Sequence, residues 1–180
     1  TMTEPNSRKV ILYLAQSLDG FIAEKDGSTA WLAALDSSES DAAIQAFQRT
    51  VDTVVMGRKT YEQSLKLAGT YPYQDKNGYV FSKTLHDTED RTHVVAGNIP
   101  EFMRQLKKED GGNIWLVGGA EIFTELLKAQ LVDELIITIA PVLLGDGISL
   151  VSTHLTDMPL ELINSRQIGH FVELTYKINY

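Results

Sequence analysis

The sequence predicts an α/β fold, a three-layer sandwich whose central sheet is mainly parallel and has antiparallel strands toward the C-terminus. Three observations lead to this prediction. Short apolar runs typical of buried strands alternate with amphipathic helical patterns along the whole chain. Glycine-containing turns separate many of them. The last strand alternates apolar and polar side chains, which is typical of an antiparallel strand.

The predicted elements follow one another without a long linker. Runs rich in valine, isoleucine and leucine predict strands at residues 9–15, 53–56, 79–81, 93–96, 114–117 and 135–139. Leu174, Tyr176 and Ile178 form the apolar face of the last strand. Apolar residues at helical spacing predict helices at residues 38–50 and 58–67, from Pro100 onward, and directly after Gly118-Gly119.

The composition is that of one globular domain. The chain has 180 residues and a mass of 20.0 kDa, with 43% hydrophobic and 22% charged residues, which are ordinary proportions for a folded protein. We expect a flexible N-terminal tail over residues 1–8 and a single domain over residues 9–180. The sequence contains no cysteine, which excludes disulfides, thiolate metal sites and a cysteine nucleophile.

The charge balance narrows the possible partners. A formal net charge of −8 and a pI of about 4.9 disfavour nucleic acids and anionic membranes. The uncharged apolar stretch at residues 135–145 is shorter than the roughly 20 residues of a membrane span, and the polar residues 1–9 do not resemble a secretory signal. We therefore expect a cytoplasmic protein with a small-molecule partner.

A glycine pair follows the strand predicted at residues 114–117. Gly118-Gly119 leads directly into a helical pattern, with Ala120 and Glu121 in its first turn. Adjacent glycines let a ligand approach the backbone, and the free N–H groups of a helix N-terminus favour a diphosphate. A tight strand-to-helix turn without a ligand is the alternative, because the pair matches neither a P-loop nor a Gly-x-Gly-x-x-Gly fingerprint.

A second strand ends in Gly57-Arg58-Lys59-Thr60, where the next helix begins. Cations at a helix N-terminus oppose the helix dipole, and a bound anionic ligand would explain them. A solvated surface pair is the alternative explanation.

A third strand ends in Ser82 and Lys83, again a hydroxyl beside a cation. Open α/β sheets bind ligands at the carboxyl ends of their strands. Three strand ends with anion-binding chemistry in an acidic protein therefore favour a nucleotide cofactor.

Other kinds of catalytic centre are not indicated. The sequence has no Gly-x-Ser-x-Gly motif, so the local sequence that usually contains the nucleophilic serine of a hydrolase triad is absent. No metal is expected, because metal-ligand spacing is absent among the four histidines, His86, His93, His154 and His170.

Taken in order, several segments resemble the dihydrofolate reductase superfamily over nearly the whole chain. Within it they are most similar to the reductase-domain branch of riboflavin biosynthesis, the RibD C-terminal-like branch. The resemblance rests on residues 15–23, 56–62, 117–123 and 132–147. The Ser-Leu-Asp-Gly sequence at residues 17–20 and the Ala-Pro-Val-Leu-Leu-Gly sequence at residues 140–145 favour the riboflavin branch.

The resemblance implies an NADPH-dependent reductase with a dihydrofolate reductase-like fold. In such an enzyme the cofactor supplies the hydride, and the protein places it against the acceptor. The positions that the resemblance assigns to the cofactor are Ala15 and Ile22 beside the nicotinamide, Gly57, Arg58, Lys59 and Thr60 around the diphosphate and adenosine phosphate, Ser82 and Lys83 at the 2′-phosphate, and Gly118, Gly119, Ala120 and Glu121 on the other side of the diphosphate.

The resemblance also implies an acid beside the substrate. Dihydrofolate reductases place this acid five residues after a tryptophan, and Trp31 and Asp36 have that spacing, although the family's intervening proline is missing. Asp36 is the catalytic candidate, with Trp31 beside it in the substrate site. A helix-capping or loop acid is the alternative explanation for Asp36, and Asp19 is the other catalytic candidate.

The substrate is less well defined. The riboflavin branch carries an arginine-containing segment for a ribose phosphate after the cofactor turn, whereas residues 63–76 contain Lys66 and Lys76 but no arginine. The leading hypothesis is a riboflavin-type reductase, similar to the enzyme that reduces 5-amino-6-(5-phosphoribosylamino)uracil. Dihydrofolate reduction is one alternative, and a nucleotide-binding module without catalysis is another.

A homodimer is also expected. The riboflavin-type relatives pair, and the stretch at residues 135–144 is more apolar than one face of a sheet requires.

Overall fold

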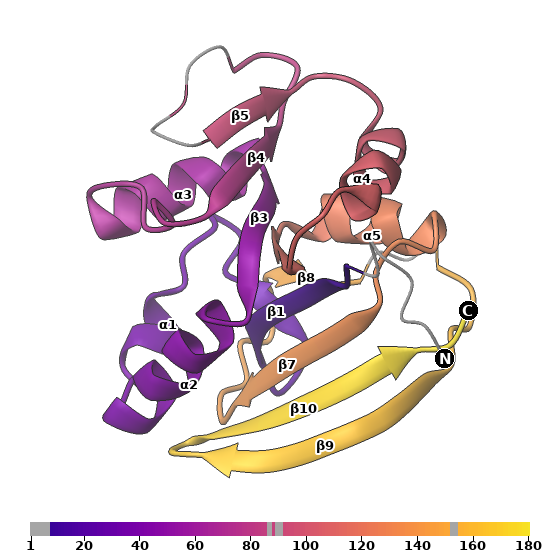
Figure 1. Cartoon of the computed structure of the whole chain (residues 1–180). Coiled ribbons are helices and arrows are strands. Elements are labelled where there is room, and N and C mark those ends of the chain that lie inside the picture. Colours follow the sequence, from indigo (N-terminus) through magenta and orange to yellow (C-terminus); the bar gives the residue numbers. More distant parts are fainter. Residues whose placement is uncertain (1–7, 86–87, 89–91, 152–154) are drawn as a thin grey trace.

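A computed structural model describes residues 8–85, 88, 92–151 and 155–180, and Figure 1 shows how its elements are arranged. An eight-stranded sheet in the order β5-β4-β3-β6-β1-β7-β10-β9 runs through the molecule. Neighbouring strands from β5 to β7 are parallel, whereas β10 is antiparallel to both β7 and β9. The predicted fold class is confirmed.

The element bounds agree closely with the predicted ones. The strands of the main sheet are β1 (Val10–Ser17), β3 (Val51–Gly57), β4 (Asn77–Phe81), β5 (Thr92–Val95), β6 (Asn113–Gly118), β7 (Glu134–Ala140), β9 (Leu160–Ile168) and β10 (Phe171–Ile178). A small second sheet contains β2 (Phe21–Ala23) and β8 (Ile148–Ser149). The helices are α1 (Ala30–Ala33), α2 (Ser38–Gln48), α3 (Arg58–Ala68), α4 (Ile99–Lys108) and α5 (Ala120–Lys128).

Two buried clusters, one on each face of the sheet, form the core. Met103 of α4 and Phe123 of α5 belong to the first cluster, whereas Phe47 of α2 and Tyr61 of α3 belong to the second. Side chains of β1, β3 and β6 alternate between the two clusters. Burial on both faces explains why these strands are continuous apolar runs in the sequence.

The apolar content of residues 135–144 has the same explanation. β7 lies between β1 and β10, with Leu135 and Ile137 in the first cluster and Ile136 packed against the second. The apolar residues at 135–140 therefore fill the two faces of a central strand, whereas Leu143, beyond the strand, is exposed.

Strand β9 and the short elements were not predicted. Residues 160–167 of β9 are all exposed, so neither face of the strand imposes an alternating pattern on the sequence. β2, β8 and α1 have two to four residues each, which is too short for a recognisable period.

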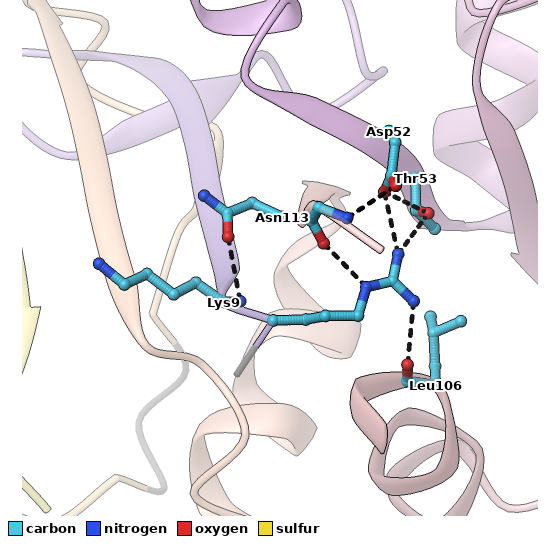
Figure 2. Close-up of polar contacts among 7 residues, drawn as sticks. Lys9, Asp52, Thr53, Leu106 and Asn113 are labelled. Atoms are coloured by element: carbon cyan, nitrogen blue, oxygen red, sulfur yellow. Dashed lines mark hydrogen bonds and ion pairs between the residues drawn. The ribbon is translucent and has the colours of Figure 1, made fainter. Parts of the chain in front are cut away.

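Arg8, which was expected to end the flexible tail, belongs to the folded domain. Figure 2 labels three of its partners, Asp52, Thr53 and Leu106. The buried guanidinium of Arg8 donates to Asp52 Oδ1 at 2.9 Å and to Thr53 Oγ1 at 2.7 Å. It also donates to the carbonyl oxygens of Gly112 at 2.8 Å and Leu106 at 3.0 Å. Arg8 thus connects the start of β1 with β3, the end of α4 and the loop before β6. Residues 1–7 lie outside the described part.

Candidate active site

The three strand ends singled out in the sequence lie at one edge of the sheet. β4, β3 and β6 are direct neighbours in that order. Gly57 at the end of β3 pairs with Phe81 at the end of β4, and Met56 pairs with Gly118 at the end of β6. The motifs that follow these strands therefore meet at the carboxyl edge, where α/β sheets bind ligands.

Two helices begin at this edge without a side-chain cap. Gly57 precedes α3 and Gly119 precedes α5, and neither helix has a side-chain hydrogen bond at its N-terminus. By contrast, Ser37 caps α2 and Asn98 caps α4. The uncapped N–H groups of α3 and α5 are suited to a diphosphate.

Glycines keep the backbone open between these two helix ends. The Gly118–Gly119 peptide bond is cis, and a Cβ on either glycine would lie 3.5 Å from Thr60 Oγ1 of α3. A Cβ on Gly57 would lie 3.2 Å from Cγ1 of Ile122 in α5. The contact at Gly57 is tight, whereas those at Gly118 and Gly119 are ordinary van der Waals contacts, so α3 and α5 approach each other closely at Gly57. The glycines leave the backbone accessible to a ligand there.

The cations of the edge are exposed or partly exposed. Arg58 donates to Glu62 at 2.7 Å within α3. Lys59 and Lys83 are exposed on α3 and after β4. These charges lie at the carboxyl edge of the sheet, on α3 and just after β4.

The hydroxyl at the end of β4 is held by a local turn. Ser82 Oγ accepts hydrogen bonds from the backbone N–H groups of Thr84 at 3.2 Å and Leu85 at 3.0 Å. After β6, Ala120 and the exposed Glu121 form the first turn of α5. The structure therefore brings the predicted diphosphate and 2′-phosphate residues to the same edge.

β1 and β2 form the neighbouring wall. Leu12 of β1 pairs with Leu116 of β6, and continuing this parallel register brings Ala15 to the level of the glycine pair. Ile22 of β2 is partly buried against the first core cluster. The two residues predicted beside the nicotinamide thus belong to β1 and to β2, the strand that follows the carboxyl end of β1.

A cavity of about 690 Å³ opens between the α1 segment and α3. Asp36 lines it and is exposed. Trp31 lies on α1 between two lining residues, and its buried indole Nε1 has no hydrogen-bond partner in the described part of the chain. The full lining is Asp26, Ser28, Thr29, Ala30, Leu32, Ala33, Asp36, Gln63, Lys66 and Leu67.

Asp19 holds two loops together. Its carboxylate accepts hydrogen bonds from Ser17 Oγ and from the N–H groups of Leu144 at 3.1 Å and Gly145 at 2.8 Å. The hydrogen bond from Ser17, followed by those from the backbone, lowers the pKa of Asp19 despite some desolvation. A carboxylate engaged in this way is poorly suited to donate a proton, which favours Asp36 of the two candidates.

The donors present fit a dinucleotide cofactor. Uncapped helix N-termini, open glycine backbone and exposed cations meet at one edge. Among the described residues, no group of three or more histidine, aspartate or glutamate side chains could hold a metal ion. His86 and His154 lie outside those residues.

Comparison with known proteins identifies the family. A family model described as the RibD C-terminal domain matches residues 8–174. The chain belongs to the RibD C-terminal domain family. This RibD-type chain is 43% identical over 171 residues to the uncharacterized protein YwjB of Bacillus subtilis, covering 94% of this chain and 97% of that protein.

Solved structures agree with this assignment. The chain superimposes on a putative riboflavin biosynthesis protein from Shewanella sp. PV-4 with a TM-score of 0.85 and 29% identity, covering 96% of this chain and 99% of that one. A Thermotoga maritima deaminase/5-amino-6-(5-phosphoribosylamino)uracil reductase gives a TM-score of 0.72 at 17% identity, covering 96% of this chain and 57% of that chain.

Dihydrofolate reductase from Enterococcus faecalis, complexed with NADP(H), gives a TM-score of 0.62 at 15% identity, covering 96% of this chain and 97% of that chain. The resemblance to the riboflavin branch is therefore confirmed, and the match to dihydrofolate reductase shows a shared fold. The family matches support a riboflavin-type reductase.

Sequence analysis did not assign Gln63 and Leu67 to the cavity. They follow Thr60 on α3 at spacings of three and seven residues, so all three share one helix face. This spacing is the sequence pattern from which their place on one helix face could have been predicted. Lys76, by contrast, is buried, and its Nζ donates to the carbonyl oxygen of Gln48 at 2.6 Å, away from the cavity.

Proposed function

We propose that this chain is an NADPH-dependent reductase of the riboflavin type, which transfers a hydride to a ribosylamino or related heterocyclic acceptor. Its family relationship supports the broader class of oxidoreductases. The observation that carries the choice of cofactor is the meeting of three anion-binding strand ends and two uncapped helix N-termini at one edge of the sheet.

The residues of this chain bind and orient the reactants. The N–H groups at the starts of α3 and α5 bind the diphosphate, and Ser82 and Lys83 bind the 2′-phosphate. Ala15 and Ile22 position the nicotinamide ring beside the acceptor. The bound dinucleotide supplies the hydride.

The reduction also requires one proton. A hydride and a proton together saturate one double bond of the acceptor, and the cofactor leaves in its oxidised form. Asp36 lines the cavity between the α1 segment and α3, and we assign to it the delivery of that proton. General acid assistance of this kind contributes roughly 10²–10⁴-fold to a rate.

The test is to follow NADPH oxidation by the purified protein with two acceptors in separate reactions. With 5-amino-6-(5-phosphoribosylamino)uracil or its dephosphorylated form, one NADPH should be consumed for each reduced pyrimidine formed. Consumption with dihydrofolate alone would instead support dihydrofolate reduction. NADPH binding without turnover of either acceptor would support the non-catalytic module.

We further propose that the reductase forms a homodimer through β9 and β10. Leu160, Leu162 and Ile163 of β9 are 43–55% exposed, and Val172 of β10 is 44% exposed. β9 is the edge strand of the main sheet, so its outer backbone groups are open to pairing. A second copy would cover this apolar edge. The cytoplasmic location stays a prediction.

A further inference from the structure

Asp36 has no side-chain partner that would fix its position. In the described part of the chain, no hydrogen bond or ion pair joins its carboxylate to another protein group, and its backbone N–H donates to the carbonyl oxygen of Ala33 at 3.3 Å. Its place therefore depends on the segments on either side of it, α1 and α2. The inference below rests on the proposed function, because Asp36 is the group to which proton delivery is assigned.

The helix that follows Asp36 begins with a capping box. Ser37 is the N-cap of α2, and its Oγ accepts a hydrogen bond from the backbone N–H of Ser40 at 3.2 Å. In return, Ser40 Oγ accepts one from the backbone N–H of Ser37 at 2.9 Å. Ser40 is buried. These bonds fix the backbone of the residue directly after Asp36.

The β9–β10 turn, which consists of Gly169 and His170, contacts this capping box beside α2 (Figure 1). The backbone N–H of Gly169 donates to Oε2 of Glu39, in the first turn of α2, at 3.1 Å. A Cβ on Gly169 would lie 2.9 Å from Ser37 Oγ, so Ser37 would have to move. Gly169 also has a φ of +57°, which glycine adopts most readily.

The β9–β10 turn is anchored in the sheet. Ile168 and Phe171, the residues on either side of it, pair with each other and are buried. Val172, the next residue of β10, pairs with Ile139 of β7. The turn is therefore a fixed support, and it connects the start of α2 to the sheet.

We infer that the β9–β10 turn positions Asp36, with Glu39 and Gly169 as the positioning residues. They fix where α2 begins, and hence where the carboxyl group of Asp36 meets the acceptor. Neither residue lines the cavity, so their effect on the reaction passes through Asp36. A proton donor must lie within hydrogen-bond reach of the atom it protonates, and a displacement of about 1 Å can lower a rate about 10²-fold.

The test measures kcat for NADPH oxidation, with an acceptor that the wild-type protein reduces, in Gly169→Ala alone and in the Asp36→Asn background. Alone, Gly169→Ala should lower kcat about tenfold, because the added Cβ displaces Ser37 and with it Asp36. The Kd for NADPH should stay unchanged. In the Asp36→Asn background Gly169→Ala should cause no further loss, because the proton donor is already absent. A purely structural role would lower kcat by the same factor in both backgrounds.

Gly69→Ala is the matched control, because Gly69 has a φ of +75° but a Cβ there would meet no atom within 4 Å. It should leave kcat unchanged. Glu39→Ala is a second variant that does not strain the backbone, so it carries the test even where Gly169→Ala does not fold. It should lower kcat about threefold, and Glu39→Gln, which keeps an acceptor oxygen for Gly169, should restore most of the loss.

Amide hydrogen exchange gives a readout that does not depend on turnover. Exchange at residues 37–41 should be faster in Gly169→Ala and Glu39→Ala than in the wild-type protein, because the start of α2 opens more often. Gly69→Ala should exchange there like the wild type.

Unchanged kcat or unchanged exchange in both variants would overturn the inference, as would an equal loss of kcat in Gly69→Ala or a full further loss in the Asp36→Asn background. Each of these results leaves the proposed function standing. A wild-type protein that binds NADPH but reduces no acceptor would remove the proposed function, and the inference with it.

Discussion

Arg8 connects the start of β1 to three segments that are far from it in the sequence. Its side chain is 4% exposed, and its hydrogen bonds reach β3, α4 and the loop before β6. A buried guanidinium is stabilising when its donors are satisfied, whereas removing it leaves the facing acceptors without a partner.

Arg8→Met should therefore lower the free energy of unfolding by about 2–4 kcal/mol, because Thr53, the buried carbonyl of Leu106 and the partly buried carbonyl of Gly112 lose a donor. Urea denaturation measures this loss. Arg104→Met is the matched control: Arg104 forms an exposed pair with Glu101 at 3.7 Å, and its removal should cost under about 0.5 kcal/mol. Equal effects of the two variants would contradict the structural role of Arg8.

The same cluster predicts a pH dependence. Burial acts to raise the pKa of Asp52, but hydrogen bonds from Gly112 and Thr53 and the charge of Arg8 outweigh it and lower the pKa. The folded-state pKa then lies below the unfolded value of about 3.9, so this stabilisation is present above that pH and is lost as pH falls further. Arg8→Met should weaken this dependence in denaturation at acidic pH.

Asp36 is the residue to which the account assigns proton delivery. Asp36→Asn should lower kcat by about 10²–10⁴-fold, because the amide cannot donate the same proton. The Kd for NADPH should stay unchanged, since Asp36 lies in the acceptor cavity rather than at the phosphate-binding edge. Turnover within about twofold of wild type would show that Asp36 is not the acid.

At the scale of the elements, the proposed cofactor site lies where α3 and α5 approach each other. Gly118 has a φ of +146°, and a Cβ there would point to within 3.5 Å of Thr60 Oγ1. Gly118→Ala should weaken NADPH binding by about tenfold or more, because an alanine rarely adopts this φ and the backbone at the proposed diphosphate site would have to shift.

Gly69→Ala is the control for that variant. Gly69 also has a positive φ, +75°, but a Cβ there would meet no atom within 4 Å. It should cost about 1 kcal/mol of stability and leave NADPH affinity unchanged. Equal NADPH affinity in Gly118→Ala and wild type would argue against a ligand at the glycine pair.

The elements also show what sequence could and could not predict. β1, β3 and β6 are buried on both faces, so their apolar runs were recognisable. β9 is exposed on both faces and left no pattern. Arg8 was assigned to the tail because its four partners lie 44 to 104 residues away in the sequence. Contacts over such separations cannot be predicted from the neighbouring residues.

The cofactor site was easier to predict than the acceptor site. Its motifs follow directly after strands, and parallel strands bring their ends to one edge. The acceptor cavity combines residues 26–36 with the middle of α3, and the sequence does not specify how these segments pack.

At the scale of the whole molecule, the exposed edge of β9 predicts a dimer. Sedimentation at micromolar concentration should show a species of about twice the 20.0 kDa chain mass. Leu162→Arg should shift it to a monomer, because a charge in an apolar interface stays unpaired.

Leu143→Arg distinguishes the two surfaces considered for the dimer. Leu143 is 71% exposed and belongs to the stretch at residues 135–144, away from β9. It should leave the dimer intact. A monomeric wild-type protein would rule out the dimer, and a monomer in Leu143→Arg alone would place the interface at that stretch instead.

The most direct test of the central claim, that the carboxyl edge binds NADPH, is a fluorescence titration with NADPH and NADH. Charge-assisted hydrogen bonds from Lys83 and Ser82 to the 2′-phosphate should make NADPH bind on the order of 10²-fold more tightly. The preference should decrease in high salt and in the Arg58→Ala, Lys83→Ala double variant, while NADH binding changes little. Equal dissociation constants for NADPH and NADH in the wild-type protein would contradict the account.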